Sequence, residues 1–424
     1  MKKVKLSLVA VAVVLLSFVS RSVNVAAQDK VQVTFWHAMN AHNQEMITSL
    51  VEEFNQSQDS IEVIEQNQGD NNALHQSIMA SGVSQTLPTM GQIIAANQAE
   101  YATNGLLLPL EGLLTEANNF PAALYDDIYA GFIPEGTFEG ELYGMPFNKS
   151  VRVIYVNNTL LDEIGAEVPT TWEDIRQVGV MLEEQGYDIP ALGVENSLNT
   201  ELESMARSNG ATWIAEDLSA VDMSSEKASE PLYFLQELIN AGYARTAGED
   251  GFMSTPFGNG ASVFYYGSSA GLAYFLPVAQ ENGYAISAIE APAFGDEKAA
   301  ILFGNNISLF QGSSEEEQAA AVEFLAFLLQ AENTARWAIN SGYLPITRAG
   351  VETELYQNHL AENPILEAAT NTLEYATSSP AYPGQSEVYS ELEMGIENVL
   401  VTGADPAEML ASVEAIAKAA LGLE

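Results

Sequence analysis

The hydrophobic pattern of the N-terminal part of the chain alternates between two periods. Residues 31–39 (VQVTFWHAM) and 61–69 (IEVIEQNQG) alternate and are rich in β-branched and aromatic side chains, so each segment predicts a strand. The segment between them places apolar residues at helical spacing: Met46, Leu50, Val51 and Phe54. A helical pattern at 72–82 and a short strand at 92–95 continue the order. Strand, helix, strand, helix, strand predicts a parallel sheet covered by helices.

The loops that follow these strands are candidates for a binding site. In open α/β sheets, ligands bind at the carboxyl ends of the strands. We therefore expect the loops after Trp36, Asn67 and Ala95 to face one cleft.

A second unit of strands and helices begins near Ser150. Residues 151–156 predict a strand, and Thr171, three residues before Asp174, predicts a helix N-cap. Just before this unit, residues 136–147 predict a hairpin with Glu139 in its turn. The polar segment 147–150 (FNKS) stands between two apolar segments. We interpret it as the point where the chain crosses between two lobes and lines a ligand cleft.

The length of the chain predicts two lobes. A chain of 424 residues is too long for one ordinary core. No low-complexity linker separates independent domains, so we expect the chain to cross between lobes more than once through short strands.

The first 27 residues form a separate segment. Three lysines precede an apolar run at 6–19, and small residues at Val25 and Ala27 follow it. This pattern is typical of a secretory signal peptide and is too short to span a bilayer comfortably. We expect cleavage near Ala27 and release of a soluble chain into a bacterial periplasm. The chain has 0 cysteines, so we expect neither disulfides nor a lipid anchor.

The charge of the chain excludes one class of partner. The formal net charge is −42, and loss of the four basic residues of segment 1–27 would bring the mature chain to about −46. Nucleic acid is a poor partner for such a surface, because no basic patch is available to neutralise phosphates.

Catalytic and metal-binding motifs are weak. His37 and His42 lie five residues apart without the glutamate of a zinc-protease motif, so we expect no metal. No Gly-rich phosphate loop is present, and we expect no cofactor. Residues 267–271 (GSSAG) match the frame of a nucleophile elbow centred on Ser269. A secreted serine hydrolase using Ser269 is therefore the alternative function, with His359 as the one histidine downstream.

Polar loop residues with aromatic neighbours recur along the chain and favour a binding function. Amides and hydroxyls hydrogen-bond polyol hydroxyls, and aromatic faces cover the apolar side of a ring. The candidates are Trp36, His37, Asn148, Ser150, Trp213, Ser268, Ser269, Asn305 and Tyr343. We expect Trp172 and Trp337, by contrast, to be core residues on helices.

Three segments together resemble a known family. They are VTFWHAM at 33–39, the stretch from YGMPFNKS to PTTWEDI at 143–175, and SGYLPIT at 341–347. The chain resembles the extracellular solute-binding proteins (family 1) of bacterial ABC importers, above all the sn-glycerol-3-phosphate-binding branch of the sugar-binding group. The likeness spreads across most of the chain after the signal segment.

This resemblance implies a fold, a function and partners. It implies an α/β, two-lobed periplasmic-binding-protein fold of type II (maltose-binding-like), with a ligand cleft between the lobes and no catalysis. We expect lobe 1 to comprise residues 28–147 and about 300–342, and lobe 2 to comprise 148–299 and about 343–424. The chain would capture sn-glycerol-3-phosphate, a glycerophosphodiester or a sugar. As a monomer, it would then deliver this solute to permease subunits in the inner membrane.

The resemblance also implies ligand-binding residues. Four positions match the pattern of the branch: Ser150, Ser268 or Ser269, Gly304 and Tyr343. Three positions depart from it. Asn71 stands where the branch has a tyrosine, Ala95 where it has a glutamate, and Ser386 or Glu387 where it has an arginine for the phosphate.

The missing arginine leaves two candidates for an anion anchor, Lys149 and Arg348. A phosphate usually requires such a cation. Strand alternation places Lys149 and Ser150 on opposite faces, so either Lys149 or Ser150 faces the cleft. Surface ion pairing is the competing interpretation for both basic residues.

We predict that salt stabilises the mature chain. The excess of acidic residues causes self-repulsion in the compact state, and dissolved ions screen it. The melting temperature should rise as NaCl increases from low to high concentration. The acidity also suggests the hypothesis that the source lives in a saline habitat. A melting temperature that stays flat over this range would contradict both this hypothesis and the predicted stabilisation by salt.

Overall fold

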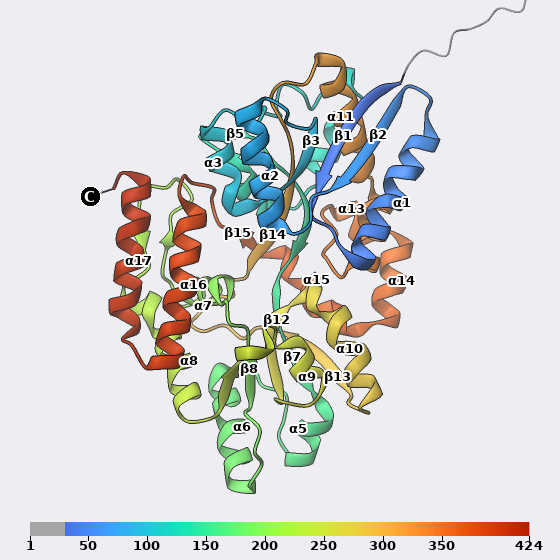
Figure 1. The fold of residues 1–424 in the computed structure, drawn as a ribbon. Coiled ribbons are helices and arrows are strands. Elements are labelled where there is room, and N and C mark those ends of the chain that lie inside the picture. Colours follow the sequence, from blue (N-terminus) through green and yellow to red (C-terminus); the bar gives the residue numbers. More distant parts are fainter. Residues whose placement is uncertain (1–29, 424) are drawn as a thin grey trace, which may run out of the picture.

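The computed structural model describes residues 30–423 and has two lobes, each built around a mixed β-sheet (Figure 1). The segment predicted to be a signal peptide lies outside the described residues. The first sheet has the strand order β15-β14-β3-β1-β2, and β6 also pairs with β14. Its strands are β1 (Val31–His37), β2 (Ile61–Asn67), β3 (Met90–Ile94), β6 (Met145–Ser150), β14 (Ile301–Leu309) and β15 (Thr377–Ser378).

The second sheet has the order β11-β8-β12-β7-β13 and forms the centre of the other lobe. Its strands are β7 (Arg152–Asn157), β8 (Leu192–Val194), β11 (Ala244–Thr246), β12 (Phe264–Ser268) and β13 (Ile286–Glu290). Two short antiparallel pairs lie outside the sheets: β4 (Thr137–Phe138) with β5 (Glu141–Leu142), and β9 (Trp213–Ile214) with β10 (Val221–Asp222).

The predicted parallel unit is present at the start of the chain. β1 pairs in parallel with β2 and with β3, whereas β14 joins β3 antiparallel. Between β1 and β2, α1 (Ala41–Ser57) buries Ile47, Leu50, Val51 and Phe54. Met46 is only partly buried, so Ile47 takes its place in the buried stripe, and the other three predicted positions are confirmed.

Helices cover the sheets and fill the remaining volume (Figure 1). Up to residue 240 they are α2 (Asn71–Ser84), α3 (Gln98–Thr103), α4 (Ala122–Asp126), α5 (Asn158–Ile164), α6 (Trp172–Gln185), α7 (Asn199–Ser208) and α8 (Glu226–Asn240). After it they are α9 (Ser254–Gly258), α10 (Leu272–Glu281), α11 (Glu315–Leu328), α12 (Ala331–Ser341), α13 (Arg348–Glu352), α14 (Glu354–Glu362), α15 (Glu367–Asn371), α16 (Gln385–Thr402) and α17 (Pro406–Leu421).

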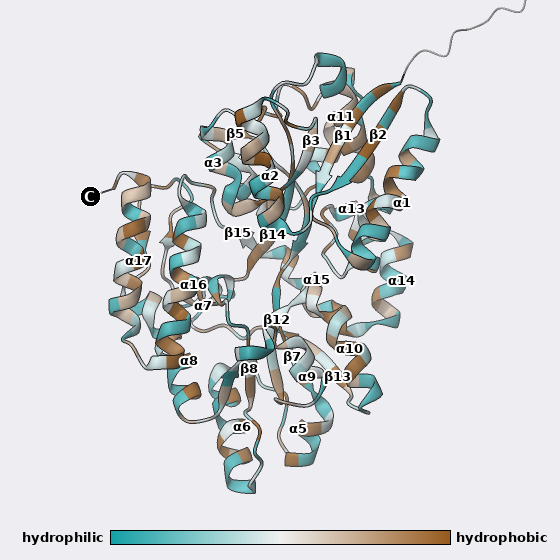
Figure 2. Ribbon diagram, viewed as in Figure 1, coloured by the Kyte–Doolittle hydropathy of each residue, from teal (hydrophilic) through white to brown (hydrophobic). Residues whose placement is uncertain are grey.

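The apolar faces of these helices build the cores. The outer helices carry both hydrophobic and hydrophilic residues, as amphipathic helices do (Figure 2). α16 and α17 pack on α8 of the second lobe, and α14 packs on α12. Trp172 and Trp337 are 4% and 2% exposed, so the prediction that both are core residues is confirmed.

The predicted turn and helix cap are also present. Glu139 and Gly140 have φ of 52° and 84°, the left-handed conformation that a tight two-residue hairpin between β4 and β5 requires. Thr171 and Asp174 form a reciprocal capping box at the start of α6.

The polar segment 147–150 is a strand rather than a corner. β6 pairs with β14 in the first sheet, and after Val151 the chain continues directly as β7 of the second sheet. The chain therefore passes between the lobes here, as the sequence predicted. β14 lies beside β6 with Ser150 opposite Phe303 and Lys149 opposite Gly304.

Gly304 allows β6 and β14 to approach this closely. Its φ is +152°, and a Cβ at this position would lie 2.0 Å from the carbonyl oxygen of Asn148. Any side chain would therefore force the two crossing strands apart.

We predict that Gly304→Ala lowers the free energy of unfolding by about 3 kcal/mol or more, because backbone atoms must move to admit the methyl group. Chemical denaturation measures the loss. Gly186→Ala is the control, since Gly186 has φ +78° with nothing within 4 Å of its added Cβ. That control should lose only about 1–2 kcal/mol from the left-handed backbone. Equal losses in the two variants would contradict the close-approach argument.

Candidate functional site: a cleft between the lobes

A cavity of about 430 Å³ lies where the two lobes and the two crossing strands meet. From the first lobe, the loop after β1, the start of α2 and the end of β3 line it. Both crossing strands contribute, and the second lobe adds the residues around the end of β12. The lining residues are Ala38, Met39, Asn40, Asn43, Asn71, Ile94, Asn148, Ser150, Phe252, Ser268, Ala270, Tyr274, Phe303, Gly304, Asn305 and Tyr343.

The lining of this first compartment is polar but uncharged. It contains the amides of Asn40, Asn43, Asn71, Asn148 and Asn305, with the hydroxyls of two serines and two tyrosines. No lysine, arginine, aspartate, glutamate or histidine is among its lining residues. Such a surface offers hydrogen-bond donors and acceptors but no charged group of its own.

Hydrogen bonds hold three of the five amides in place. Asn305 Nδ2 donates to Asn71 Oδ1 at 3.0 Å and so joins β14 to the start of α2. Asn148 Oδ1 accepts from Nε2 of the buried Gln92 at 3.2 Å. The other end of the Gln92 amide accepts from the backbone N–H of Ala38 at 3.1 Å. The amides therefore present fixed orientations to a ligand.

Four aromatic residues line the cavity beside the polar groups: Phe252, Tyr274, Phe303 and Tyr343. Tyr343 stacks on Trp337 with ring centroids 6.2 Å apart and planes inclined by 2°. Burial raises the pKa of Tyr343, although a hydrogen bond with Asn148 opposes the shift. Phe252 and Tyr274, by contrast, are 73% and 63% exposed. Two large rings thus stand free at the mouth of the cleft on the second lobe.

A second compartment of about 490 Å³ continues the cleft over the second lobe. It shares five lining residues with the first: Asn40, Phe252, Ser268, Ala270 and Tyr274. Its further lining includes the charged residues Arg152, Glu195 and Asp250, together with Tyr265. Asp250 pairs with Arg245 at 2.7 Å.

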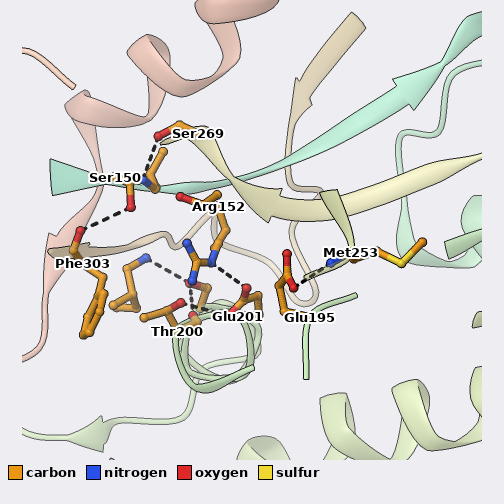
Figure 3. A network of polar contacts seen from close by, with 12 residues as sticks. Ser150, Arg152, Glu195, Thr200, Glu201, Met253, Ser269 and Phe303 are labelled. Carbon is orange, nitrogen blue, oxygen red and sulfur yellow. Dashed lines mark hydrogen bonds and ion pairs between the residues drawn. The ribbon is translucent and has the colours of Figure 1, made fainter. Parts of the chain in front are cut away.

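A residue of helix α7 fixes the guanidinium of Arg152 through a hydrogen bond (Figure 3). Its Nε donates to Oε1 of the buried Glu201 at 2.6 Å. Burial lowers the pKa of Arg152, but the attraction of Glu201, with smaller contributions from Tyr265 and Glu195, outweighs this effect, so the pKa is raised and the guanidinium keeps its charge.

Seven of the predicted site residues line the first compartment. They are Asn71, Asn148, Ser150, Ser268, Gly304, Asn305 and Tyr343. Four of the others lie elsewhere: Trp36, His37, Trp213 and Ser269. The alternation of β6 explains part of this outcome, because Asn148 and Ser150 share the face that meets the cavity.

Trp36 and His37 support the sheet rather than the cavity. Trp36 Nε1 donates to Gln66 Oε1 at 2.7 Å. His37 is fully buried, with Nδ1 accepting from the N–H of Met39 at 3.2 Å and Nε2 lying 3.4 Å from Glu65. The cavity begins with the next residue, Ala38.

Trp213 lies in the core of the second lobe, where it is 1% exposed. It belongs to the short strand β9, whose partner β10 closes a small hairpin. The structure does not bring this tryptophan to the cleft.

Ser269 joins the crossing segment to the second lobe. Its hydroxyl accepts from the N–H of Val151 at 3.3 Å, and its own N–H donates to the carbonyl of Val151 at 2.8 Å. The side chain is buried, and none of the hydrogen bonds described for residues 30–423 joins it to a histidine or a carboxylate. The match to a nucleophile elbow thus corresponds to a strand-to-helix turn that clamps the backbone.

Neither candidate anion anchor reaches the cavity. Lys149 is fully buried on the other face of β6, where its Nζ pairs with Glu135. Burial raises the pKa of Glu135 and lowers that of Lys149, and the attraction between the two groups opposes both shifts. Arg348 lies 4.5 Å from the ring centroid of Tyr129 and donates to the carbonyl of Ile128.

Sequence reasoning missed several lining residues, above all Asn40, Asn43, Arg152, Phe252 and Tyr274. Asn40 lies in the loop after β1 that was predicted to face the cleft, and Asn43 lies in the first turn of α1 that follows it, so the amides there were a usable signal. Phe252 and Tyr274 gave none, because the exposure of an aromatic residue depends on how the lobes fold around it.

Comparison with known proteins places the chain in a family. The family model of the bacterial extracellular solute-binding proteins matches residues 49–367. The chain belongs to this family, as the resemblance in the sequence indicated.

The individual relatives share less than a quarter of the aligned residues with this chain. The chain is 24% identical over 353 residues to the sn-glycerol-3-phosphate-binding periplasmic protein UgpB of Salmonella typhimurium, with 80% of each chain covered. It is 23% identical over 359 residues to the protein of the same name from Escherichia coli K12, covering 82% of this chain and 81% of that one.

Solved structures confirm the maltose-binding-like, two-lobed fold. The cyclic alpha-maltosyl-1,6-maltose binding protein of Arthrobacter globiformis superimposes with a TM-score of 0.80 at 22% identity, covering 92% of this chain and 99% of that one. UgpB from Mycobacterium tuberculosis, in complex with glycerophosphocholine, gives a TM-score of 0.80 at 20% identity and covers 92% and 98%.

We predict that Lys149 matters for stability. Lys149→Met leaves Glu135 buried without its partner, which should lower the free energy of unfolding by about 3–5 kcal/mol in chemical denaturation. Adding Glu135→Leu should recover most of this loss, because an apolar pair of similar volume replaces a buried ion pair at little cost.

The control is Lys298→Met, which removes one partner of the more exposed Lys298–Glu290 pair. It should cost less than about 1 kcal/mol. A Lys149→Met variant as stable as this control would show that Glu135 does not depend on Lys149.

Proposed function

We propose that the chain is the solute-binding component of an ABC importer and that its ligand is an uncharged, polyhydroxylated solute, a sugar. Family membership supports the first part. The single observation that carries the second is the lining of the first compartment, which holds five amides and no charged side chain.

The chemistry of the lining fits a sugar. Each asparagine amide both donates and accepts, so it can pair with hydroxyl groups in either direction. The faces of Tyr343, Tyr274 and Phe252 offer apolar surface for the carbon side of a sugar ring. Pockets that combine such walls with a few placed polar groups are typical ligand sites.

A glycerophosphodiester is the second candidate, and glycerol-3-phosphate is the third. Two observations support them: the names of the relatives, and Arg152 in the second compartment, which is the one cationic side chain among the residues that line the cleft. The sugar is favoured because the first compartment offers a phosphate no cation at all.

We propose that binding is coupled to closure of the lobes, without catalysis. The hinge would lie near residues 148–151 and again near 300–303, where the crossing strands pair. We further propose that the mature chain is a monomer of the periplasm, cleaved near Ala27, and that its closed form docks on permease subunits in the inner membrane. Within residues 30–423, no helix combines the length and apolar character needed to cross a bilayer.

We predict that a neutral sugar stabilises the refolded, ligand-stripped protein. A ligand present at about one hundred times its dissociation constant should add about 2.7 kcal/mol of stability, which a thermal-shift screen detects. The panel holds maltose, trehalose, monosaccharides, glycerophosphocholine and sn-glycerol-3-phosphate. A shift with phosphorylated compounds alone would overturn the sugar assignment and favour the second or third candidate.

We predict that Tyr274→Ala weakens binding of whichever panel compound is found, by about tenfold, because one aromatic wall is lost. Calorimetric titration measures the dissociation constant. The melting temperature without ligand should hardly change, because this ring is already 63% exposed. Tyr187→Ala, at a 38% exposed site away from the cleft, is the control and should leave affinity unaltered. Unchanged affinity in Tyr274→Ala would remove this ring from the site.

A further inference from the structure

Arg152 is the one place in the cleft where an anionic group of a ligand would find a cation. Among the residues lining the two compartments, no lysine, histidine or second arginine is present. Of the guanidinium nitrogens, the hydrogen bonds described for residues 30–423 engage Nε alone, through Glu201. The terminal nitrogens remain as donors beside the second compartment, and the side chain is 18% exposed.

The positive charge of Arg152 is already paired with the carboxylate of Glu201 on α7. Glu201 is fully buried and lies 2.6 Å from Nε, and its other oxygen accepts from the hydroxyl of Thr200 at 2.9 Å. This carboxylate fixes the guanidinium against α7 and offsets its charge (Figure 3).

Glu195 adds a second carboxylate to the same wall. It lines the second compartment and lies close enough to Arg152 to raise the pKa of the arginine. Its Oε2 accepts from the N–H of Met253 at 3.0 Å (Figure 3). Its Oε1 accepts from the hydroxyl of Tyr265. No ion pair is described for Glu195 among residues 30–423, whereas the neighbouring Asp250 has Arg245.

We propose that Glu195 determines the specificity of the cleft by excluding anionic ligands from Arg152. With Glu201 and Glu195 beside one guanidinium, the wall of the second compartment bears more negative than positive charge. The terminal N–H groups of Arg152 then serve neutral oxygen atoms, such as sugar hydroxyls. This inference deepens the proposed function, since it rests on the cleft being the ligand site, and it assigns the rejection of phosphate esters to one residue.

Glutamine at position 195 can keep both hydrogen bonds that Glu195 makes. The amide oxygen of Glu195→Gln can accept from the N–H of Met253, and its NH₂ can donate to the hydroxyl oxygen of Tyr265. The substitution therefore removes the charge while keeping both contacts. Glu195→Ala is a second neutral variant that removes the side chain altogether.

The test is calorimetric titration of wild type and Glu195→Gln with sn-glycerol-3-phosphate, and with glycerol as its uncharged counterpart, at low ionic strength. Removing a unit charge a few ångströms from the phosphate should tighten binding of glycerol-3-phosphate by about tenfold or more. The dissociation constants of glycerol and of maltose should change by less than about threefold, because neither ligand carries a charge that Glu195 could repel.

Two further variants sharpen the result. Glu183→Gln is the matched control, because Glu183 also accepts from a tyrosine hydroxyl, that of Tyr243 at 2.6 Å, but lies outside the cleft. It should leave the affinity for glycerol-3-phosphate unchanged. Glu195→Gln combined with Arg152→Lys should lose the gain, because lysine can still pair with Glu201 but lacks the terminal guanidinium donors.

The outcomes separate this inference from the proposed function. Equal affinity of wild type, Glu195→Gln and Glu195→Ala for glycerol-3-phosphate, including no binding by any of them, overturns the role of Glu195. A gain in Glu195→Gln without any sugar binding in either form supports the role of Glu195 and refutes the sugar assignment.

Discussion

The pairing of the two crossing strands, β6 and β14, is the constraint on which the rest of the molecule depends. These strands run side by side from one lobe toward the other, and Gly304 lets their backbones meet where any Cβ would collide with the carbonyl of Asn148. The same strands supply Asn148, Ser150 and Asn305 to the cavity. The hydrogen-bond ladder between the two crossing strands therefore also sets the spacing of the cavity-facing amides, so the geometry of the crossing and that of the cavity are determined together.

Helix α7 ties these crossing segments to the second lobe through an unusually polar buried face. Glu201 pairs with Arg152 at the start of β7, Ser204 Oγ accepts from the N–H of Ile301 at the start of β14, and Glu203 accepts from Ser379 after β15. Buried polar groups are retained at a cost unless each has a partner, and here the partners come from three separate passages of the chain. One helix thus contacts all three of these segments and fixes their positions relative to one another. One of its partners, Arg152, forms part of the cleft wall.

The charge of the residues that line the cleft contrasts with the charge of the whole chain. A protein with a formal net charge of −42 keeps the first compartment of its cleft free of charged side chains and places Arg152, Glu195 and Asp250 only in the second. Coulomb effects are strongest where water is excluded, so a single carboxylate near a bound ligand counts for more than many on the solvated surface. The field that a ligand meets is therefore set by a few residues at the cleft, not by the bulk acidity.

The sequence alone determined the elements and the family, because periodicity, capping residues and turn residues act over a few positions: the parallel β1–β3 unit, the Thr171 cap, the Glu139–Gly140 turn and the crossing at residues 147–150 could all be predicted. Seven cavity residues could be predicted as well, since they lie at strand ends or on matched motifs. Only the tertiary structure decided which face of β6 lines the cavity, that Lys149 pairs with Glu135 on the other face, that Trp213 is core, and that Arg152 and Glu195 share a wall. Those outcomes depend on contacts between segments far apart in the chain, such as Arg152 with Glu201, and no local pattern of residues encodes which distant partner a buried charge will find.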